Sequence, residues 1–356
     1  MLKSPLPRFR DRGTAAEFYG ALAAAEIPFA VNAKKLPVWD APPDSGGAER
    51  HGTMKKTRLP MTRQRKKEAL SAYLFIAPMF LGLLVFSVGP FFENIFFSFR
   101  KMGTFGNGTF IGLRNYQKLL QDDTFWLALR NTFFYAIVGV PLVILFSIFF
   151  ANLVNKNIRG RTLYRTLLYI PAITMPAAIS ILWRWILNYQ YGILNFLMEK
   201  IGLNRVSWLG DVRYVRWAII LVLVWSMVSY YTIIMLAAMQ GIDKSYYEAA
   251  RIDGANNRQL FFKITLPMLG PMIFFSVIMV TIGILQIFDF IYLMVDRTTY
   301  SYTYSLSLVT YFYECAFNKS SMRGYGAAIS VVLALIIVII TLVQMLVKKY
   351  WIKTGD

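Results

Sequence analysis

The chain has 356 residues, of which 56% are hydrophobic, and a mean hydropathy of +0.47, which is too apolar for an ordinary soluble domain. Its 38 Lys and Arg against 19 Asp and Glu give a formal charge of +19; in so apolar a chain this favours basic loops beside a membrane over a nucleic-acid-binding surface. A single Cys, Cys315, and a single His, His51, argue against an internal disulfide, a Cys/His metal site and a histidine-based triad.

The first 53 residues do not resemble the rest of the chain, and they contain no apolar run long enough for a signal peptide. We expect an atypical extension that is disordered, or that was added to the chain or arises from too early a start; a genuine disordered segment or small N-terminal domain is the alternative. A basic cytoplasmic tail at 54–70 follows, and its opening "MKKTRLPMTRQRKKEAL" has the character of a natural start.

Six later segments are free of charged residues and about as long as a membrane-spanning helix requires. The third is the shortest and contains Pro171 and Pro176, and the fifth has Pro267 near its start, where proline suits a first helical turn. The sequence therefore predicts an all-α integral membrane domain over 71–347 with a cytoplasmic tail at 348–356. The six segments are residues 73–92, 131–154, 166–183, 217–242, 264–288 and 324–347.

Loop charges predict the orientation of these spans. With the N-terminus inside, the inner segments hold 18 Lys and Arg in 55 residues, and the outer segments hold 13 in 100. This asymmetry favours both termini inside. Arg184 and Asp289 then fall at outer ends of spans, where snorkelling to headgroups explains each and a gate pair is the alternative.

The longest inner loop, residues 243–267, is polar and patterned. Ser245 and Glu248 have the spacing of a capping box, which predicts a helix that starts there and stops at Gly254. Asn256 or Asn257 would cap a second helix. From the residues alone, the alternative is a plain amphipathic loop at the membrane surface.

The spacing of this loop resembles a known motif. Its pattern E-A-A-x3-G-x9-I-x-L-P is that of the EAA loop of ABC transporter permeases, and the segments at 111–132 and 161–195 resemble the carbohydrate-importing branch, similar to maltose and oligosaccharide importer permeases. The resemblance implies that a coupling helix docks into a cytoplasmic ATPase. The matching residues are Glu248, Ala249, Ala250, Gly254, Ile264, Leu266 and Pro267.

The same resemblance implies a type I ABC importer permease fold and its partners. These are a second permease subunit, two cytoplasmic ATPase subunits that bind ATP and Mg²⁺, and an extracytoplasmic solute-binding protein, all at the bacterial cytoplasmic membrane. The sequence has no G-x-x-x-x-G-K-[ST] phosphate loop. We therefore expect a transport subunit that is no enzyme and holds no cofactor or metal of its own.

Polar and aromatic residues within the spans are candidates for a substrate pathway, because polar groups in a span are costly unless they face a cavity or another helix. Similarity to the maltose-importer permeases supports four of them, and ordinary helix packing is the alternative for each. The candidates are Tyr230, Gln286, Met227, Ser226, Ala177 and Thr174.

Three other functions compete with sugar import. The same fold could import a glycerol-phosphate type of solute or an acidic sugar, but no uncharged segment contains an Arg or Lys for an anion, which favours a neutral sugar. An intramembrane enzyme would need Asp, Glu or His within its spans, and the six segments have none. A secondary transporter would carry ionisable residues or broken-helix repeats at mid-depth.

Overall fold

The computed structural model describes residues 63–102, 108–156 and 159–351. The extension expected at 1–53 lies outside the described residues, as do residues 54–62 of the basic tail and 352–356 of the C-terminal tail. The chain divides into two units, Met1–Glu68 and Ala69–Asp356. Of the first unit only residues 63–68 are described, as the start of a helix, so the fold below is that of the second unit.

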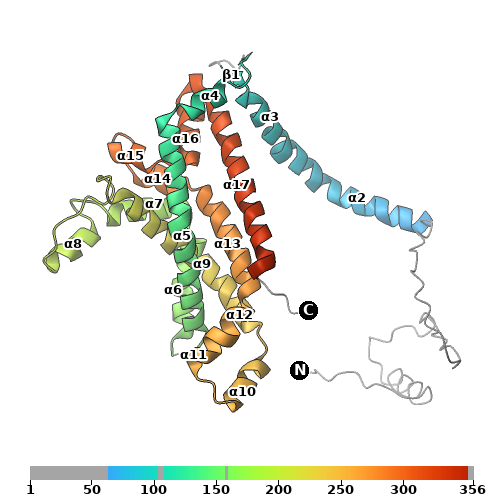
Figure 1. Cartoon of the computed structure of the whole chain (residues 1–356), viewed down its shortest axis with the longest axis vertical. Coiled ribbons are helices and arrows are strands. Elements are labelled where there is room, and N and C mark those ends of the chain that lie inside the picture. Colours follow the sequence, from blue (N-terminus) through green and yellow to red (C-terminus); the bar gives the residue numbers. More distant parts are fainter. Residues whose placement is uncertain (1–62, 103–107, 157–158, 352–356) are drawn as a thin grey trace. The chain divides into compact units, whose positions relative to one another are not determined.

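Helices build nearly all of the described chain (Figure 1). The first half contains one short antiparallel hairpin, in which Arg100 pairs with Phe110. Its elements are α2 Arg63–Leu83, the π-turn Leu84–Val88, α3 Gly89–Ser98, β1 Arg100–Lys101, β2 Thr109–Phe110, α4 Arg114–Leu120, α5 Asp123–Asn155, α6 Arg161–Ile173, α7 Pro176–Ile186, α8 Ile193–Lys200 and α9 Val215–Gln240.

The second half alternates short and long helices. Short helices α10 and α11 lie at one end of the bundle, and α4 and β1 lie at the opposite end (Figure 1). The elements are α10 Lys244–Ile252, α11 Asn257–Leu260, the π-turn Phe261–Thr265, α12 Leu266–Met268, α13 Gly270–Leu285, α14 Asp289–Met294, α15 Tyr300–Ser305, α16 Leu308–Tyr313, the π-turn Glu314–Asn318, the 3₁₀ turn Ser320–Met322 and α17 Arg323–Trp351.

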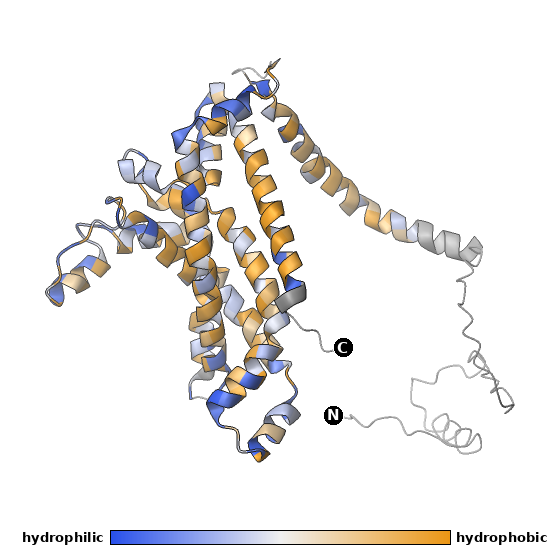
Figure 2. Cartoon of the chain, in the orientation of Figure 1, coloured by the Kyte–Doolittle hydropathy of each residue, from blue (hydrophilic) through white to orange (hydrophobic). Residues whose placement is uncertain are grey.

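Four helices of the described chain are long and apolar enough to cross a membrane. They cover the segments predicted at 73–92, 131–154, 217–242 and 324–347, and Figure 2 shows α3 and α17 almost wholly hydrophobic where α10 is not. In the most apolar stretch of 18 residues in α9, 61% of the residues are buried, whereas the corresponding stretch of the first helix, Ser71–Ser98, has 0% buried. The chain therefore packs around α9 and leaves its first helix for lipid or another subunit to cover. The four are Ser71–Ser98, Asp123–Asn155, Val215–Gln240 and Arg323–Lys348.

The other two predicted spans are not straight helices. Between α6 and α7 the chain bends by 104° at Thr174 and Met175, inside the segment predicted as a span at 166–183. Pro176 is the physical reason, because proline disfavours helical geometry in the preceding residue, and Met175 is extended. A second bend of 63° separates α12 from α13, just before Pro271. The structure thus has four candidate spans, or up to six if each bent pair counts as one.

Side chains of α5 hold the loop between α15 and α16. The Asn131 amide donates to the carbonyls of Tyr304, at 2.6 Å, and Leu306, at 3.1 Å. Tyr135 donates to the Ser305 carbonyl at 2.8 Å. Because Asn131 and Tyr135 are fully buried, these bonds satisfy backbone groups that water cannot reach. They fix the junction of α15 and α16 to α5 at the end of the bundle opposite α10.

Asp122 joins three helices at that end. Its carboxylate caps α5 by accepting from the Thr124 amide at 2.9 Å, and it also accepts from the hydroxyls of Tyr311 and Tyr325. Burial raises the pKa of Asp122, but the hydrogen bonds from Tyr311, Tyr325 and the backbone outweigh burial and leave the pKa below its usual value. Asp122 therefore connects the start of α5 to α16 and α17 as a carboxylate.

Helix α17 begins against the backbone of β1. A Cβ at Gly324 would lie 1.9 Å from the carbonyl oxygen of Arg100, so only glycine permits this approach. Farther along α17, Ser330 accepts a hydrogen bond from the Asn94 amide of α3 at 2.8 Å. These contacts pair α3 with α17.

Candidate functional site

The polar loop forms the predicted helix, turn and helix, but its first cap differs from the prediction. The carboxylate of Asp243 accepts from the Ser245 amide at 2.9 Å, and α10 already begins at Lys244. Ser245 is therefore inside the first turn, and the capping box predicted for Ser245 and Glu248 is wrong. An Asp two residues earlier is an equally good cap that the box pattern overlooks.

The turn after α10 is a Schellman motif. Gly254 has a φ of +81°, and its amide donates to the Arg251 carbonyl at 3.0 Å. The Ala255 amide donates to the Ala250 carbonyl at 2.9 Å. Both bonds of the motif are present, and a left-handed residue at this position favours glycine. The predicted helix stop at Gly254 is confirmed.

Asn256 then caps α11 with a complete capping box. Its side chain accepts from the Gln259 amide at 2.9 Å, and the Gln259 side chain accepts from the Asn256 amide at 2.8 Å. Asn256, one of the two predicted caps, is therefore the one used. A hydrogen bond of 3.0 Å between the hydroxyls of Tyr247 and Thr265 ties α10 to the turn before α12.

The predicted coupling residues fall into an outward-facing set and an inner set. Glu248 and Ala249 on α10 are exposed, and the neighbouring Ile252 is 86% exposed. Glu248, Ala249 and Ile252 thus stand on the exposed surface of α10. The inner set consists of Ile264 and Leu266, which are half-buried, with Leu266 packed against the core. Pro267 follows in α12 and is exposed.

The six predicted pathway residues lie on three parts of the chain, which are α9, the α6–α7 bend with the start of α7, and the end of α13. Tyr230 is 56% exposed on α9, beside the half-buried Ser226 and Met227. Met227 reaches α13, where its Cε lies 3.1 Å from the place of a Cβ on Gly283. The remaining three are Thr174 at the α6–α7 bend, which donates to the Ile170 carbonyl at 2.7 Å, and the exposed Ala177 and Gln286.

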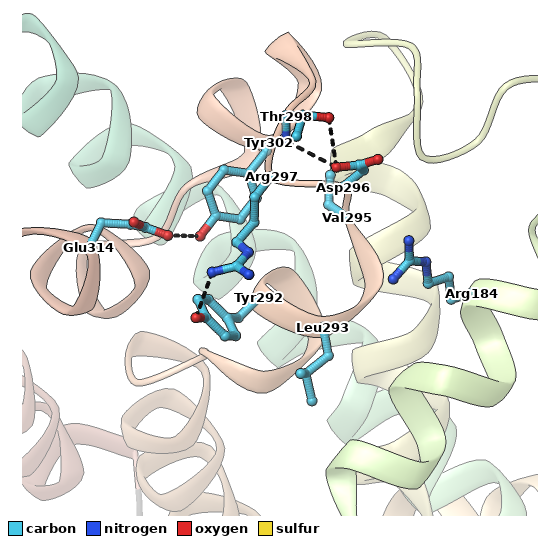
Figure 3. A pocket seen from close by; sticks show the side chains of 9 residues that line it. All are labelled: Arg184, Tyr292, Leu293, Val295, Asp296, Arg297, Thr298, Tyr302 and Glu314. Carbon is cyan, nitrogen blue, oxygen red and sulfur yellow. Dashed lines mark hydrogen bonds between the residues drawn. The ribbon is translucent and has the colours of Figure 1, made fainter. Parts of the chain in front are cut away.

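A cavity of about 540 Å³ lies beside α14 and α15 (Figure 3), and both helices lie away from the α10 end of the bundle (Figure 1). None of the six pathway residues, all within the described chain, lines it. Arg184, which follows directly after the third predicted span at 166–183, lies in the last turn of α7 beyond the bend and lines the cavity. The cavity residues are Arg184 of α7, Tyr292 and Leu293 of α14, Val295, Asp296, Arg297 and Thr298 of the following loop, Tyr302 of α15 and Glu314.

Both carboxylates of the cavity already accept hydrogen bonds from uncharged donors. Glu314 accepts from Tyr302 at 2.6 Å and from the Asn318 amide at 2.7 Å. Burial and this bond raise the pKa of the Tyr302 hydroxyl, which therefore stays a donor. Asp296 accepts from the Thr298 amide at 3.0 Å and hydroxyl at 2.9 Å. These bonds, with a smaller contribution from the charge of Arg184, lower the pKa of Asp296.

Aromatic rings form one wall beside the cavity. Arg297 lies over the Tyr292 ring at 4.8 Å and donates to its hydroxyl at 2.8 Å. Tyr292 stacks on Phe288 at 4.9 Å, and Tyr313 continues the row to the exposed Phe317 at 5.0 Å. Rings with adjacent hydroxyl and charged groups are suited to a ligand that has both apolar faces and hydroxyls. The sequence analysis did not single out this wall, although Tyr and Phe are frequent over residues 288–317 and could have indicated it.

Residues 131–352 match the family described as binding-protein-dependent transport system inner membrane component. The chain belongs to this family. It is also 36% identical over 294 residues to a probable ABC transporter permease, YesP, of Bacillus subtilis (strain 168), covering 82% of this chain and 94% of that protein. It is 32% identical to the trehalose/maltose permease MalF of Thermococcus litoralis, covering 81% of this chain and 97% of the relative.

Further relatives and solved structures agree with the family. The lactose permease LacF of Rhizobium radiobacter is 32% identical, covering 77% of this chain and 93% of the relative. A bacterial ABC transporter for import of the acidic polysaccharide alginate has the same fold, with a TM-score of 0.71 at 23% identity over 81% of this chain and 98% of that one. A second alginate transporter structure, in complex with an alginate-pentasaccharide-bound periplasmic protein, matches with a TM-score of 0.72 at 24% identity over 82% and 99%.

These matches confirm the resemblance drawn from the EAA loop. The chain is an integral membrane permease subunit with the fold of an ABC importer. Among the described residues, no group of three or more His, Cys, Asp or Glu could hold a metal ion.

Proposed function

We propose that this chain is one of two membrane-spanning subunits of an ATP-driven importer that carries a sugar or oligosaccharide across the bacterial cytoplasmic membrane by alternating access. The observation that carries this proposal is the α10–α11 element, capped at both starts, joined by a Schellman turn and exposing Glu248, Ala249 and Ile252. It provides a rigid docking surface on a chain that has no phosphate loop of its own. The curated relatives include permeases named for maltose, lactose and arabinooligosaccharides.

In this proposal the chain has six spans, each bent pair counting as one, and both ends face the cytoplasm. The α10–α11 loop is then cytoplasmic and couples to a pair of ATPase subunits that bind ATP and Mg²⁺. Closure of the ATPases would move the docked loop and rock the spans. The bend between α6 and α7 would let the third span change shape with little loss of hydrogen bonding.

The opposite end of the bundle would receive the saccharide from a solute-binding protein. Support comes from the alginate transporter structure solved with its loaded periplasmic protein. The cavity beside α14 would be the first site of contact, and the row of residues Ser226, Met227, Tyr230 and Gln286 would lie deeper along the pathway. Sugars suit such a route, since aromatic faces and hydroxyl-bonding groups alternate along it.

Charge reversal on α10 tests the coupling. The chain is co-expressed with its genomic neighbours, purified, and assayed in nanodiscs for ATPase activity stimulated by loaded binding protein. Glu248→Lys should reduce both ATPase capture and stimulated hydrolysis. The matched control is Asp123→Lys, an equal reversal at an exposed position of α5 at the opposite end, which should leave capture unchanged. Equal capture by Glu248→Lys and wild type would refute α10 as the docking helix.

A further inference from the structure

Arg184 has an unusual setting for a cation next to an apolar segment. It is exposed on α7, and its guanidinium points into the cavity toward Asp296 (Figure 3). Within the described chain it forms no hydrogen bond or ion pair; the ion pairs there are Arg205 with Glu199 and Arg213 with Asp211. All of its N–H donors are therefore free for a ligand.

The 104° bend places this arginine in the cavity. On a straight span, Arg184 would sit at the membrane surface, where its charge is explained by lipid headgroups. After the bend, α7 packs against α14 and turns its last residues toward the loop at Asp296 and Arg297. The absence of Arg and Lys from the six apolar segments therefore does not exclude an anionic substrate.

The balance of hydrogen bonds in the cavity favours an anion over a cation. Glu314 accepts on both of its oxygens, from Tyr302 and Asn318, and Asp296 accepts on Oδ1 from Thr298. Of the two arginines, Arg297 uses one N–H on Tyr292, and Arg184 uses none. Among the described residues neither arginine forms an ion pair with Asp296 or Glu314, so both guanidinium groups can bind an anionic acceptor of a ligand.

We propose that this cavity binds the carboxylate of an acidic sugar, so that the saccharide carried by the transporter contains a uronic acid residue. A guanidinium binds a carboxylate with two parallel N–H···O bonds. The cavity volume of about 540 Å³ is in the range of small-molecule sites, roughly 300–1,000 Å³. The ring of Tyr292, which lines the cavity and is backed by Phe288, would face the apolar side of the sugar.

A carboxylate fits this cavity better than a phosphate does. Two arginines and two carboxylates give the cavity a formal charge of zero. A uronate adds one negative charge, whereas a phosphate adds about 1.5 to 2. Since Asp296 already lies near Arg184, the larger charge would be repelled more strongly. This inference rests on the proposed function, because it names the substrate class of the same importer.

The test uses the assembled transporter in nanodiscs, first without binding protein. Binding of trigalacturonate, a neutral trisaccharide and a sugar phosphate is measured by calorimetry. Wild type should bind the uronate best, and Arg184→Gln should weaken that binding at least tenfold while leaving the neutral sugar unchanged. Arg184→Lys should recover part of the loss, because lysine keeps the positive charge but cannot form the two parallel N–H···O bonds of a guanidinium. Arg213→Gln, which removes an exposed arginine outside the cavity, should match wild type.

The remaining outcomes separate this inference from the proposed function. If neutral and acidic sugars bind equally and Arg184→Gln changes neither, the acidic-sugar assignment is wrong and sugar import stands. If the sugar phosphate binds best, the anion is not a carboxylate. If no loaded binding protein stimulates the ATPase of wild type, the import function itself fails. Should Arg184→Gln not assemble, Arg297→Gln on the same cavity replaces it, with a smaller loss of uronate affinity expected.

Discussion

Replacement of Gly254 perturbs the α10–α11 element through its backbone alone. Gly254 has a φ of +81°, and no heavy atom lies within 4 Å of the place its Cβ would take. A new side chain therefore meets no clash, and only the left-handed conformation is penalised. That penalty is about 1–2 kcal/mol for an L-residue, small for Asn and largest for β-branched residues.

This penalty predicts an order of affinities for the ATPase. If only the Schellman turn presents α10 correctly, 1–2 kcal/mol lowers the apparent affinity by roughly five- to thirtyfold. Gly254→Asn should bind nearly as well as wild type, Gly254→Ala less well, and Gly254→Val least. The assay titrates the ATPase onto the permease pair in nanodiscs. Gly270→Ala is the control, because a Cβ there also meets nothing within 4 Å and its φ is not positive.

Two results would refute the reasoning. If Asn and Val weaken docking equally, the loss comes from the side chain at the interface and the backbone conformation is irrelevant. If Gly254→Val docks like wild type, α10 reaches the ATPase without this turn. Either result leaves the fold of the loop intact but removes Gly254 from the coupling argument.

Three further changes test the fold around the site. Gly324→Ala should prevent α17 from closing on β1 and lower the midpoint of thermal unfolding in detergent, whereas Gly82→Ala, where a Cβ meets nothing within 4 Å, should not. Asn131→Ala should destabilise by about 2 kcal/mol or more, because two buried carbonyls lose their donor, and chemical denaturation would measure the difference. The pKa of Asp122 is lowered in the folded state, so its contribution to stability is present above the unfolded pKa of about 3.9 and lost as the pH falls through the folded value. Asp122→Asn should remove that acid-dependent component of a thermal pH series, and an unchanged profile would contradict the assignment.

The sequence by itself determined the class of the protein and the motif for coupling. Apolar runs of membrane-spanning length predict helices in lipid, because a bilayer offers no partner to unpaired backbone groups. Local spacing likewise predicted the stop at Gly254 and a cap at Asn256 or Asn257, since helix ends depend on a few neighbouring residues. The local pattern failed at Ser245, where Asp243 competes for the same role two residues earlier.

Only the tertiary structure decided where charge meets the pathway. Proline at position 176 indicates a break, but its size of 104° and its direction depend on what α7 packs against. That packing brings Arg184 beside Asp296 and Arg297, residues more than 100 positions away in the chain, and leaves the six predicted pathway residues outside the cavity. Because the cavity is assembled from residues distant in sequence, no spacing pattern along the chain predicts it. Hydropathy determines which residues enter the membrane, and packing determines which of them face one another.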